Sequence, residues 1–131
     1  MIEVNNTTKA KINSKKIIKI VEAFIKFYKL KNFDVSVAIV SDKVMHDMNL
    51  TYRGLDKTTD VLSFCGLNEI IISHEQIKRQ AKELKKGIES ELIFILVHGL
   101  LHLIGREDNK EVLRLAMIAE GEKFLKKCGI I

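Results

Sequence analysis

The spacing of apolar side chains predicts five helices, at residues 14–30, 42–52, 74–86, 90–104 and 110–127. In the first helix, apolar residues recur every three or four positions, as on the buried face of an amphipathic helix. Ser14, Asp42 and Ser73 are the expected N-caps, because their side chains can accept hydrogen bonds from free backbone N–H groups. Gln76 completes a capping-box pattern with Ser73. The strongly apolar segment 90–104 predicts a helix buried in the middle of the fold.

Short runs rich in β-branched residues predict four strands, at residues 1–4, 34–41, 61–64 and 70–73. A short turn around Gly66 separates the last two strands, so they are close enough to form a hairpin. Because strands and helices interleave, we expect an α+β fold with a small mixed sheet of about four strands packed with about five helices. The length of 131 residues is that of one ordinary domain, so we expect residues 1–131 to form a single domain.

Composition narrows the class of protein. The hydrophobic fraction of 47% argues against disorder. No apolar run approaches the ~20 residues that span a bilayer, and the N-terminus lacks the apolar core of a secretory signal. We therefore expect a cytoplasmic protein without a membrane partner. The net charge of +5 is compatible with an anionic partner such as nucleic acid. Cys65 and Cys128 form no CxxC pair and are expected to be reduced thiols packed as small apolar groups.

The segment HGLLHLIGREDNKE, residues 98–111, holds the strongest chemical signal. His98 and His102 are four residues apart on a predicted helix, so their imidazoles share one face and can share a metal ion. Gly105 can adopt a positive φ and reverse the chain, which would bring Asp108 back beside the histidines. Zinc accepts carboxylate oxygen as well as imidazole nitrogen. The sequence therefore predicts a metal site of His98, His102 and Asp108 at the end of the buried central helix.

Other interpretations of this segment stay open. The two histidines could be hydrogen-bonded core groups, although buried imidazoles without polar neighbours are costly. Glu107, Asn109 or Glu111 could replace Asp108 as the third ligand. The spacing also matches that of metzincin proteases. However, Gly99 stands where those enzymes place their glutamate base, so the pattern does not support peptidase chemistry.

Two segments resemble the signature of the YbeY family. HGLLHLIGRED is similar to the family pattern H-G-x-L-H-L-x-G-Y-D-H, and MNLTYRGLDKTTDVLSF, residues 48–64, resembles its L-N-x-x-Y-R-x-x-D-K-P-T-D-V-L-S-F stretch. The resemblance covers about residues 34–120. It implies a single-strand-specific, metal-dependent endoribonuclease that acts in maturation of the small-subunit (16S) ribosomal RNA and in ribosome quality control. The family site is a three-histidine zinc site.

Carried over residue by residue, the resemblance makes His98 and His102 the first two ligands and Arg53 the arginine important for activity. The third histidine of the pattern falls on Asp108. An anionic ligand lowers the formal charge of the site by one, so the metal should acidify its water less. The site should also tolerate harder metals such as Mn²⁺. We expect one Zn²⁺ per chain.

The resemblance makes single-stranded RNA, ribosomal RNA or the small ribosomal subunit the expected partner, and no DNA. The metal would activate water or act as a Lewis acid, while Arg53 would stabilise the phosphate. No general base stands out, and Glu107 is the nearest candidate. His46 and His74 lack partner spacing and are expected to be structural or exposed. A basic stripe could face either RNA or solvent; it comprises Lys78, Arg79, Lys82, Lys85 and Lys86.

Two alternatives to the nuclease remain. One is a ribosome-associated RNA-binding assembly factor whose metal site is structural or weakly active, which the change from histidine to Asp108 favours. The other is a metalloprotease-like hydrolase, which Gly99 disfavours. A comparison of RNA cleavage with RNA binding separates the first alternative from the nuclease.

Overall fold

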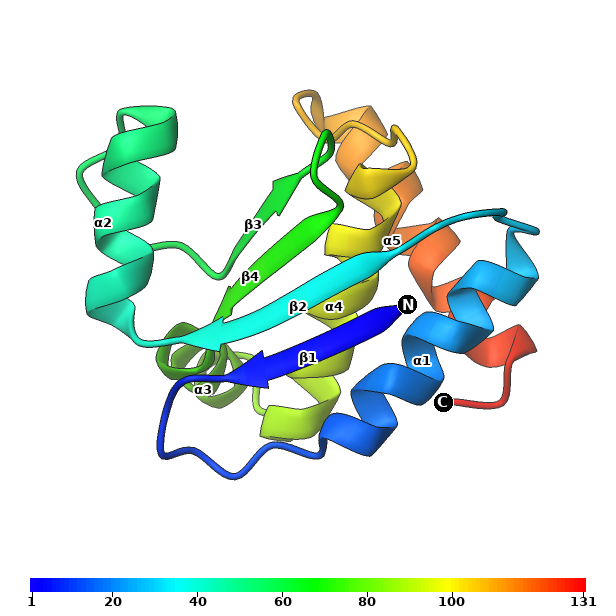
Figure 1. Cartoon of the computed structure of the whole chain (residues 1–131), viewed down its shortest axis with the longest axis horizontal. Coiled ribbons are helices and arrows are strands. Elements are labelled where there is room, and N and C mark those ends of the chain that lie inside the picture. The colour runs from blue at the N-terminus through cyan, green and yellow to red at the C-terminus, as the bar shows by residue number, and fades with distance from the viewer.

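A computed structural model describes the whole chain, from Met1 to Ile131 (Figure 1). It contains a four-stranded sheet and five helices, as the sequence predicted. In chain order the elements are β1 (Ile2–Asn6), α1 (Ser14–Phe27), β2 (Val35–Val40), α2 (Asp42–Arg53), β3 (Val61–Phe64), β4 (Glu69–Ser73), α3 (His74–Glu83), α4 (Ile88–Leu103) and α5 (Glu111–Lys127). None of the five helices combines the length and apolar character needed to cross a membrane.

The sheet has the strand order β1-β2-β4-β3 and is mixed. Strands β1, β2 and β4 run parallel, with Val37 between Val4 of β1 and Ile70 of β4. Strand β3 runs antiparallel to β4, with Val61 opposite Ile72, so these two strands form the expected hairpin. The hairpin places the end of β3 at the edge of the sheet, beside helix α4.

Residues on alternate faces of the sheet build two hydrophobic clusters, because successive strand side chains point to opposite faces. The larger cluster joins one face of β2 and β4 to α1, α4 and α5. The smaller one is covered by α2 and consists of Val40, Met45, Leu62 and Ile71. Figure 1 shows α2 at the left of the sheet, apart from the other helices. Helix α4 is buried along most of its length, as predicted, with Leu96, Leu100 and Leu101 fully enclosed.

Two of the three predicted N-caps were wrong by one residue. Asn13, not Ser14, caps α1, and its side chain accepts a hydrogen bond from the Lys16 N–H at 3.1 Å. Ser41, not Asp42, caps α2. The Asp42 side chain instead accepts hydrogen bonds from the guanidinium of Arg79 on helix α3. Ser73 caps α3 as predicted, accepting from the Gln76 N–H at 3.3 Å.

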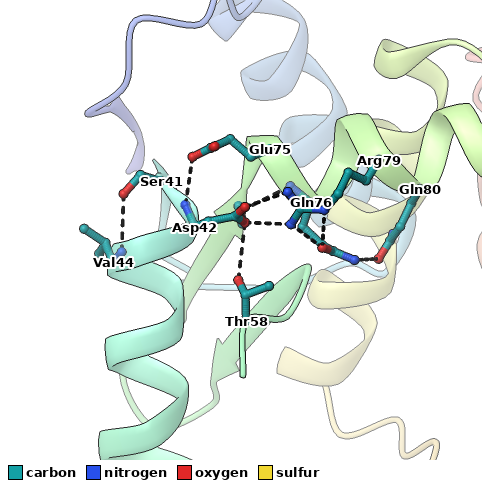
Figure 2. A network of polar contacts seen from close by, with 9 residues as sticks. Ser41, Asp42, Val44, Thr58, Glu75, Gln76, Arg79 and Gln80 are labelled. Atoms are coloured by element: carbon teal, nitrogen blue, oxygen red, sulfur yellow. Dashed lines mark hydrogen bonds and ion pairs between the residues drawn. The ribbon is translucent and has the colours of Figure 1, made fainter. Parts of the chain in front are cut away.

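The Asp42 carboxylate ties the start of α2 to α3 and to the loop that precedes β3 (Figure 2). Arg79 donates to both carboxylate oxygens, at 2.6 and 2.9 Å. The hydroxyls of Ser73 and Thr58 donate to the same carboxylate. Arg79 therefore has a structural partner, and Lys86 pairs with Glu91 at 3.0 Å. Two members of the predicted basic stripe, Arg79 and Lys86, are therefore already paired with acidic residues of the fold.

We expect Asp42→Asn to destabilise the protein at neutral pH more than at acidic pH. The hydrogen bonds from Arg79 hold the pKa of Asp42 below its usual value, against burial, which raises it. The ionised carboxyl therefore stabilises the fold above the unfolded pKa of about 3.9, and this contribution is lost as the pH falls through the folded pKa. The free energy of unfolding should drop by about 1–2 kcal/mol at pH 7.

Chemical denaturation at pH 7 and pH 3 measures this difference. Asp47→Asn is the matched control, because Asp47 lies on the same helix and forms only an exposed pair with Lys43. An equal loss for Asp42→Asn at both pH values would contradict the assignment of the stability to its ionised form.

Candidate metal centre

Three side chains that can bind a metal converge at the C-terminal end of α4. His98 and His102 come from the last two turns of the helix, and Asp108 comes from the loop that follows. The Asp108 Oδ2 atom lies 3.0 Å from His98 Nε2 and 3.3 Å from His102 Nε2. The spacing of four residues and the reversal of the chain thus bring together the three residues that the sequence singled out.

The reversal that returns Asp108 to the helix follows from Gly105. This glycine has a φ of +97°, a conformation that other residues rarely adopt. The Gly105 N–H donates to the His102 carbonyl and the Arg106 N–H donates to the Leu101 carbonyl, both at 3.0 Å. This pair of bonds is a Schellman motif, which ends the helix and turns the chain back along it.

The donor atoms fit a tetrahedral metal ion. Ligand atoms ~2.0–2.1 Å from a tetrahedral zinc ion lie about 3.3 Å apart, close to the two distances from Asp108. Each of the three residues offers one donor atom, and these atoms all lie within 4.8 Å of one another. The histidines are only 15% and 24% exposed, so an ion held there would be shielded on the helix side.

The protonation of the site suits metal binding. Burial raises the pKa of Asp108, but the hydrogen bond from His98 and the neighbouring His102 outweigh burial and hold the pKa below its usual value. The carboxyl is therefore an anion at neutral pH. The His102 Nδ1 atom lies 3.0 Å from the carbonyl oxygen of Arg106, which can only accept. A proton on Nδ1 satisfies this contact and would leave Nε2, which faces Asp108, available to a metal.

The alternative third ligands do not join this group. Glu107 and Asn109 are exposed in the loop, and Glu111 is exposed at the start of α5, where it contacts Arg114. Glu107, the nearest general-base candidate in the sequence, does not line the cleft described below. His46 is half-buried and lies 2.6 Å from Asp56, far along the chain from the site.

A cleft of about 470 Å³ opens over the three residues. Arg53, at the end of α2, lines one part of it and forms none of the ion pairs of the fold. Asp60 and Arg114 also line the cleft, and sequence reasoning did not single them out. Asp60 falls in the segment TTDV, inside the stretch that resembles the family, which was the only available signal for it. No pattern in the sequence could have indicated Arg114, because this residue reaches the cleft only through the packing of α5.

Cys65 was predicted to be packed as a small apolar group, and this was wrong, because its side chain is exposed. The residue directly follows β3, where the chain leaves the sheet and enters the hairpin turn. Its thiol donates to the His102 carbonyl at 3.3 Å and lines the cleft. Cys128 is also a free thiol and is half-buried.

Gly99 packs against the sheet and not into the cleft. A Cβ atom at this position would lie 3.2 Å from Ser63 Oγ and 3.3 Å from Cγ2 atoms of both Val61 and Ile70. The position that holds the glutamate base in zinc peptidases is therefore filled by the β3–β4 hairpin. The structure supplies a steric reason for the glycine, in agreement with the expectation that peptidase chemistry is unsupported.

Comparisons with known proteins find several relatives of this chain. The chain is 38% identical to the Endoribonuclease YbeY of Aquifex aeolicus over 111 residues, which are 78% of this chain and 74% of that protein. It is 34% identical to the Endoribonuclease YbeY of a Wolbachia pipientis strain over 119 residues, 83% of this chain and 78% of that protein. The solution structure of TM1509 from Thermotoga maritima matches with a TM-score of 0.67 and 27% identity, covering 97% of this chain and 91% of that one.

The family model described as Endoribonuclease YbeY matches residues 2–129, nearly the whole chain. This extends the resemblance seen in the two motifs to both ends of the fold. The family is one of hydrolases that cleave RNA phosphodiester bonds, and this chain has a His-His-Asp group that can bind a metal ion. We conclude that the chain belongs to the Endoribonuclease YbeY family.

Proposed function

We propose that this protein is an endoribonuclease that cuts single-stranded RNA at the cleft over His98, His102 and Asp108, with one bound Zn²⁺. The observation that carries the proposal is the convergence of three metal-binding side chains beneath a cleft that also holds two arginines. Membership of the family supplies RNA as the substrate class. Arg53 and Arg114 come from different helices, so a phosphate chain lying across the cleft can contact both.

Each group in the cleft has a distinct task in this proposal. A divalent ion held by the three ligands supplies Lewis acidity toward the phosphodiester. Arg53 offers a planar fork of donors that matches phosphate oxygens, and it is free for this task because the fold gives it no acidic partner. Arg114 makes only a long 3.4 Å contact with Glu111 and can add a second phosphate contact.

The natural substrate that we propose is small-subunit (16S) ribosomal RNA, with roles in its maturation and in ribosome quality control in the cytoplasm. The resemblance of both motifs to the family supports this, and the net charge of +5 favours a polyanionic partner. Zinc is the proposed ion because two imidazoles and a carboxylate at tetrahedral spacing suit it. Mn²⁺ is the proposed second choice, because the carboxylate makes the ligand set harder.

We expect Arg53→Ala to slow cleavage of single-stranded ribosomal RNA by about 10- to 100-fold, because a donor to developing phosphate charge is lost. Arg53→Lys should recover part of the rate, since it keeps the charge but not the fork. Cleavage rates with a labelled RNA and the zinc-loaded protein measure this effect.

Lys43→Ala is the matched control, because Lys43 lies on the same helix as Arg53 but is exposed and pairs with Asp47. If Arg53→Ala cuts as fast as Lys43→Ala, Arg53 has no role in the reaction. If the wild-type protein binds RNA but does not cut it, the RNA-binding assembly factor replaces the nuclease as the best account.

A further inference from the structure

Three side chains from distant parts of the chain meet beside the metal centre. Arg106 lies in the loop after α4, Glu120 lies on α5, and Tyr28 lies at the end of α1. Arg106 donates to both oxygens of Glu120, at distances of 2.9 to 3.2 Å. The Tyr28 hydroxyl donates to the same carboxylate at 2.7 Å, and the guanidinium lies 5.8 Å from the centre of the Tyr28 ring.

We propose that this cluster of Arg106, Glu120 and Tyr28 positions His102 for metal binding. The link is the backbone of Arg106, whose carbonyl oxygen accepts the hydrogen bond from His102 Nδ1 at 3.0 Å. The side chain of Arg106 is held on α5, and its N–H is held by the Leu101 carbonyl. The carbonyl therefore stays aimed at Nδ1, which orients the ring with Nε2 toward Asp108.

The loop depends on this cluster because it has few other attachments. Glu107, Asn109 and Lys110 are exposed, and α5 begins without a side-chain cap. Apart from those of the candidate ligands, the side-chain hydrogen bonds that join residues 106–110 to the rest of the fold are the three from Arg106 to Glu120. The same loop carries Asp108, so the cluster constrains two of the three ligands.

The cluster suits a rigid support. A guanidinium that donates two parallel bonds to a carboxylate has a defined orientation, which a single ion contact lacks. Burial and then Glu120 raise the pKa of Tyr28, so the phenol stays protonated. Its hydroxyl donates a hydrogen bond to the carboxylate. Glu120 thus accepts hydrogen bonds from both Tyr28 and Arg106, and it joins α1 and the loop to α5.

This inference rests on the metal site of the proposed function, and it is tested by zinc affinity. A chromophoric chelator competes for zinc with the wild-type protein, Glu120→Ala and Glu120→Gln. Removing an outer partner of a metal ligand costs about 10- to 100-fold in affinity, so Glu120→Ala should raise the zinc Kd by about tenfold. Glu120→Gln keeps one acceptor oxygen and should lie between the two.

Glu122→Ala is the matched control, because Glu122 is exposed on the same helix and carries the same charge. The proposal predicts wild-type zinc affinity for this control. A cluster that only stabilises the fold would lower the melting temperature of Glu120→Ala and leave its zinc affinity unchanged, and that result would overturn the proposal. A wild-type protein that binds no zinc would remove the metal site itself.

Nitrogen-15 chemical shifts of His102 in the metal-free protein supply a second readout, which does not depend on Glu120→Ala being well folded. We expect the His102 shifts to differ between the wild type and Glu120→Gln, because the contact between Nδ1 and the Arg106 carbonyl is less well held in the variant. Identical shifts in both proteins would show that the cluster does not orient His102.

Discussion

Replacing His102 with alanine is expected to abolish stoichiometric zinc binding and to raise the zinc Kd by more than about a hundredfold. The loss of an outer partner already costs about 10- to 100-fold, and this change removes one of three donors directly. It also leaves Asp108 with a single nitrogen, His98 Nε2, at 3.0 Å. Elemental analysis of protein purified without chelators and a competition titration measure the two quantities.

His46→Ala is the control for this variant, because it removes a half-buried imidazole that pairs with Asp56 outside the cleft. One zinc per chain in the wild type and in His46→Ala, against none in His102→Ala, is the expected pattern. Zinc bound to His102→Ala with wild-type affinity would place the ion somewhere else.

Introducing the glutamate base of a zinc peptidase, as Gly99→Glu, is expected to unfold the protein and not to create a peptidase. The new Cβ atom would lie within 3.3 Å of Ser63, Val61 and Ile70, and the rest of the side chain would bring a charge into the buried face of α4. Overpacking costs about 1–3 kcal/mol, and an unpaired buried charge adds several more. The sum is comparable to the whole stability of an ordinary domain, about 5–15 kcal/mol.

Circular dichroism and thermal denaturation measure this loss. Gly99→Ala should be far milder, because its gain in helix propensity of about 1 kcal/mol offsets part of the crowding. Gly121→Ala, where a Cβ atom would meet only Val97 closely, is a control on another buried glycine. A folded Gly99→Glu protein with peptidase activity would refute the assignment of this position to packing.

Local patterns in the sequence were enough to predict the elements. Apolar spacing placed each helix to within a few residues, because the burial of one face depends on a period that neighbouring residues share. The predicted cap of α2 was wrong because a tertiary contact competed: Asp42 could serve as a cap by residue type, but Arg79 binds it. Asn13 and Ser41, one position earlier, make the capping bonds.

Strand order could not be predicted, because it depends on contacts between segments far apart in the chain. β2 pairs with β4 across more than thirty residues, as in Val37 opposite Ile70. The buried charge of Glu91 was missed for the same reason. It lies within the apolar helix α4, only 2% exposed, and its partners Gln80 and Lys86 come from α3 and the turn after it.

Part of the candidate site could likewise be predicted from local sequence patterns, and part of it could not. His98 and His102 share a helix face, and Gly105 dictates the turn, so local geometry was sufficient to predict their meeting with Asp108. The composition of the cleft could be seen only in the folded structure, because Arg53 and Arg114 are 61 residues apart and come from separate helices. The cluster that supports His102 was also invisible in the sequence, since Tyr28 and Glu120 are 92 residues apart.

The most direct test of the account is internal cleavage of a labelled single-stranded ribosomal RNA fragment by the zinc-loaded protein. We predict that a chelator stops the cleavage, that one equivalent of zinc restores it, and that His98→Ala remains inactive with or without zinc. Cleavage by the chelated protein and by His98→Ala as fast as by the zinc-loaded wild type, or no cleavage by a protein that holds one zinc per chain, would contradict the account.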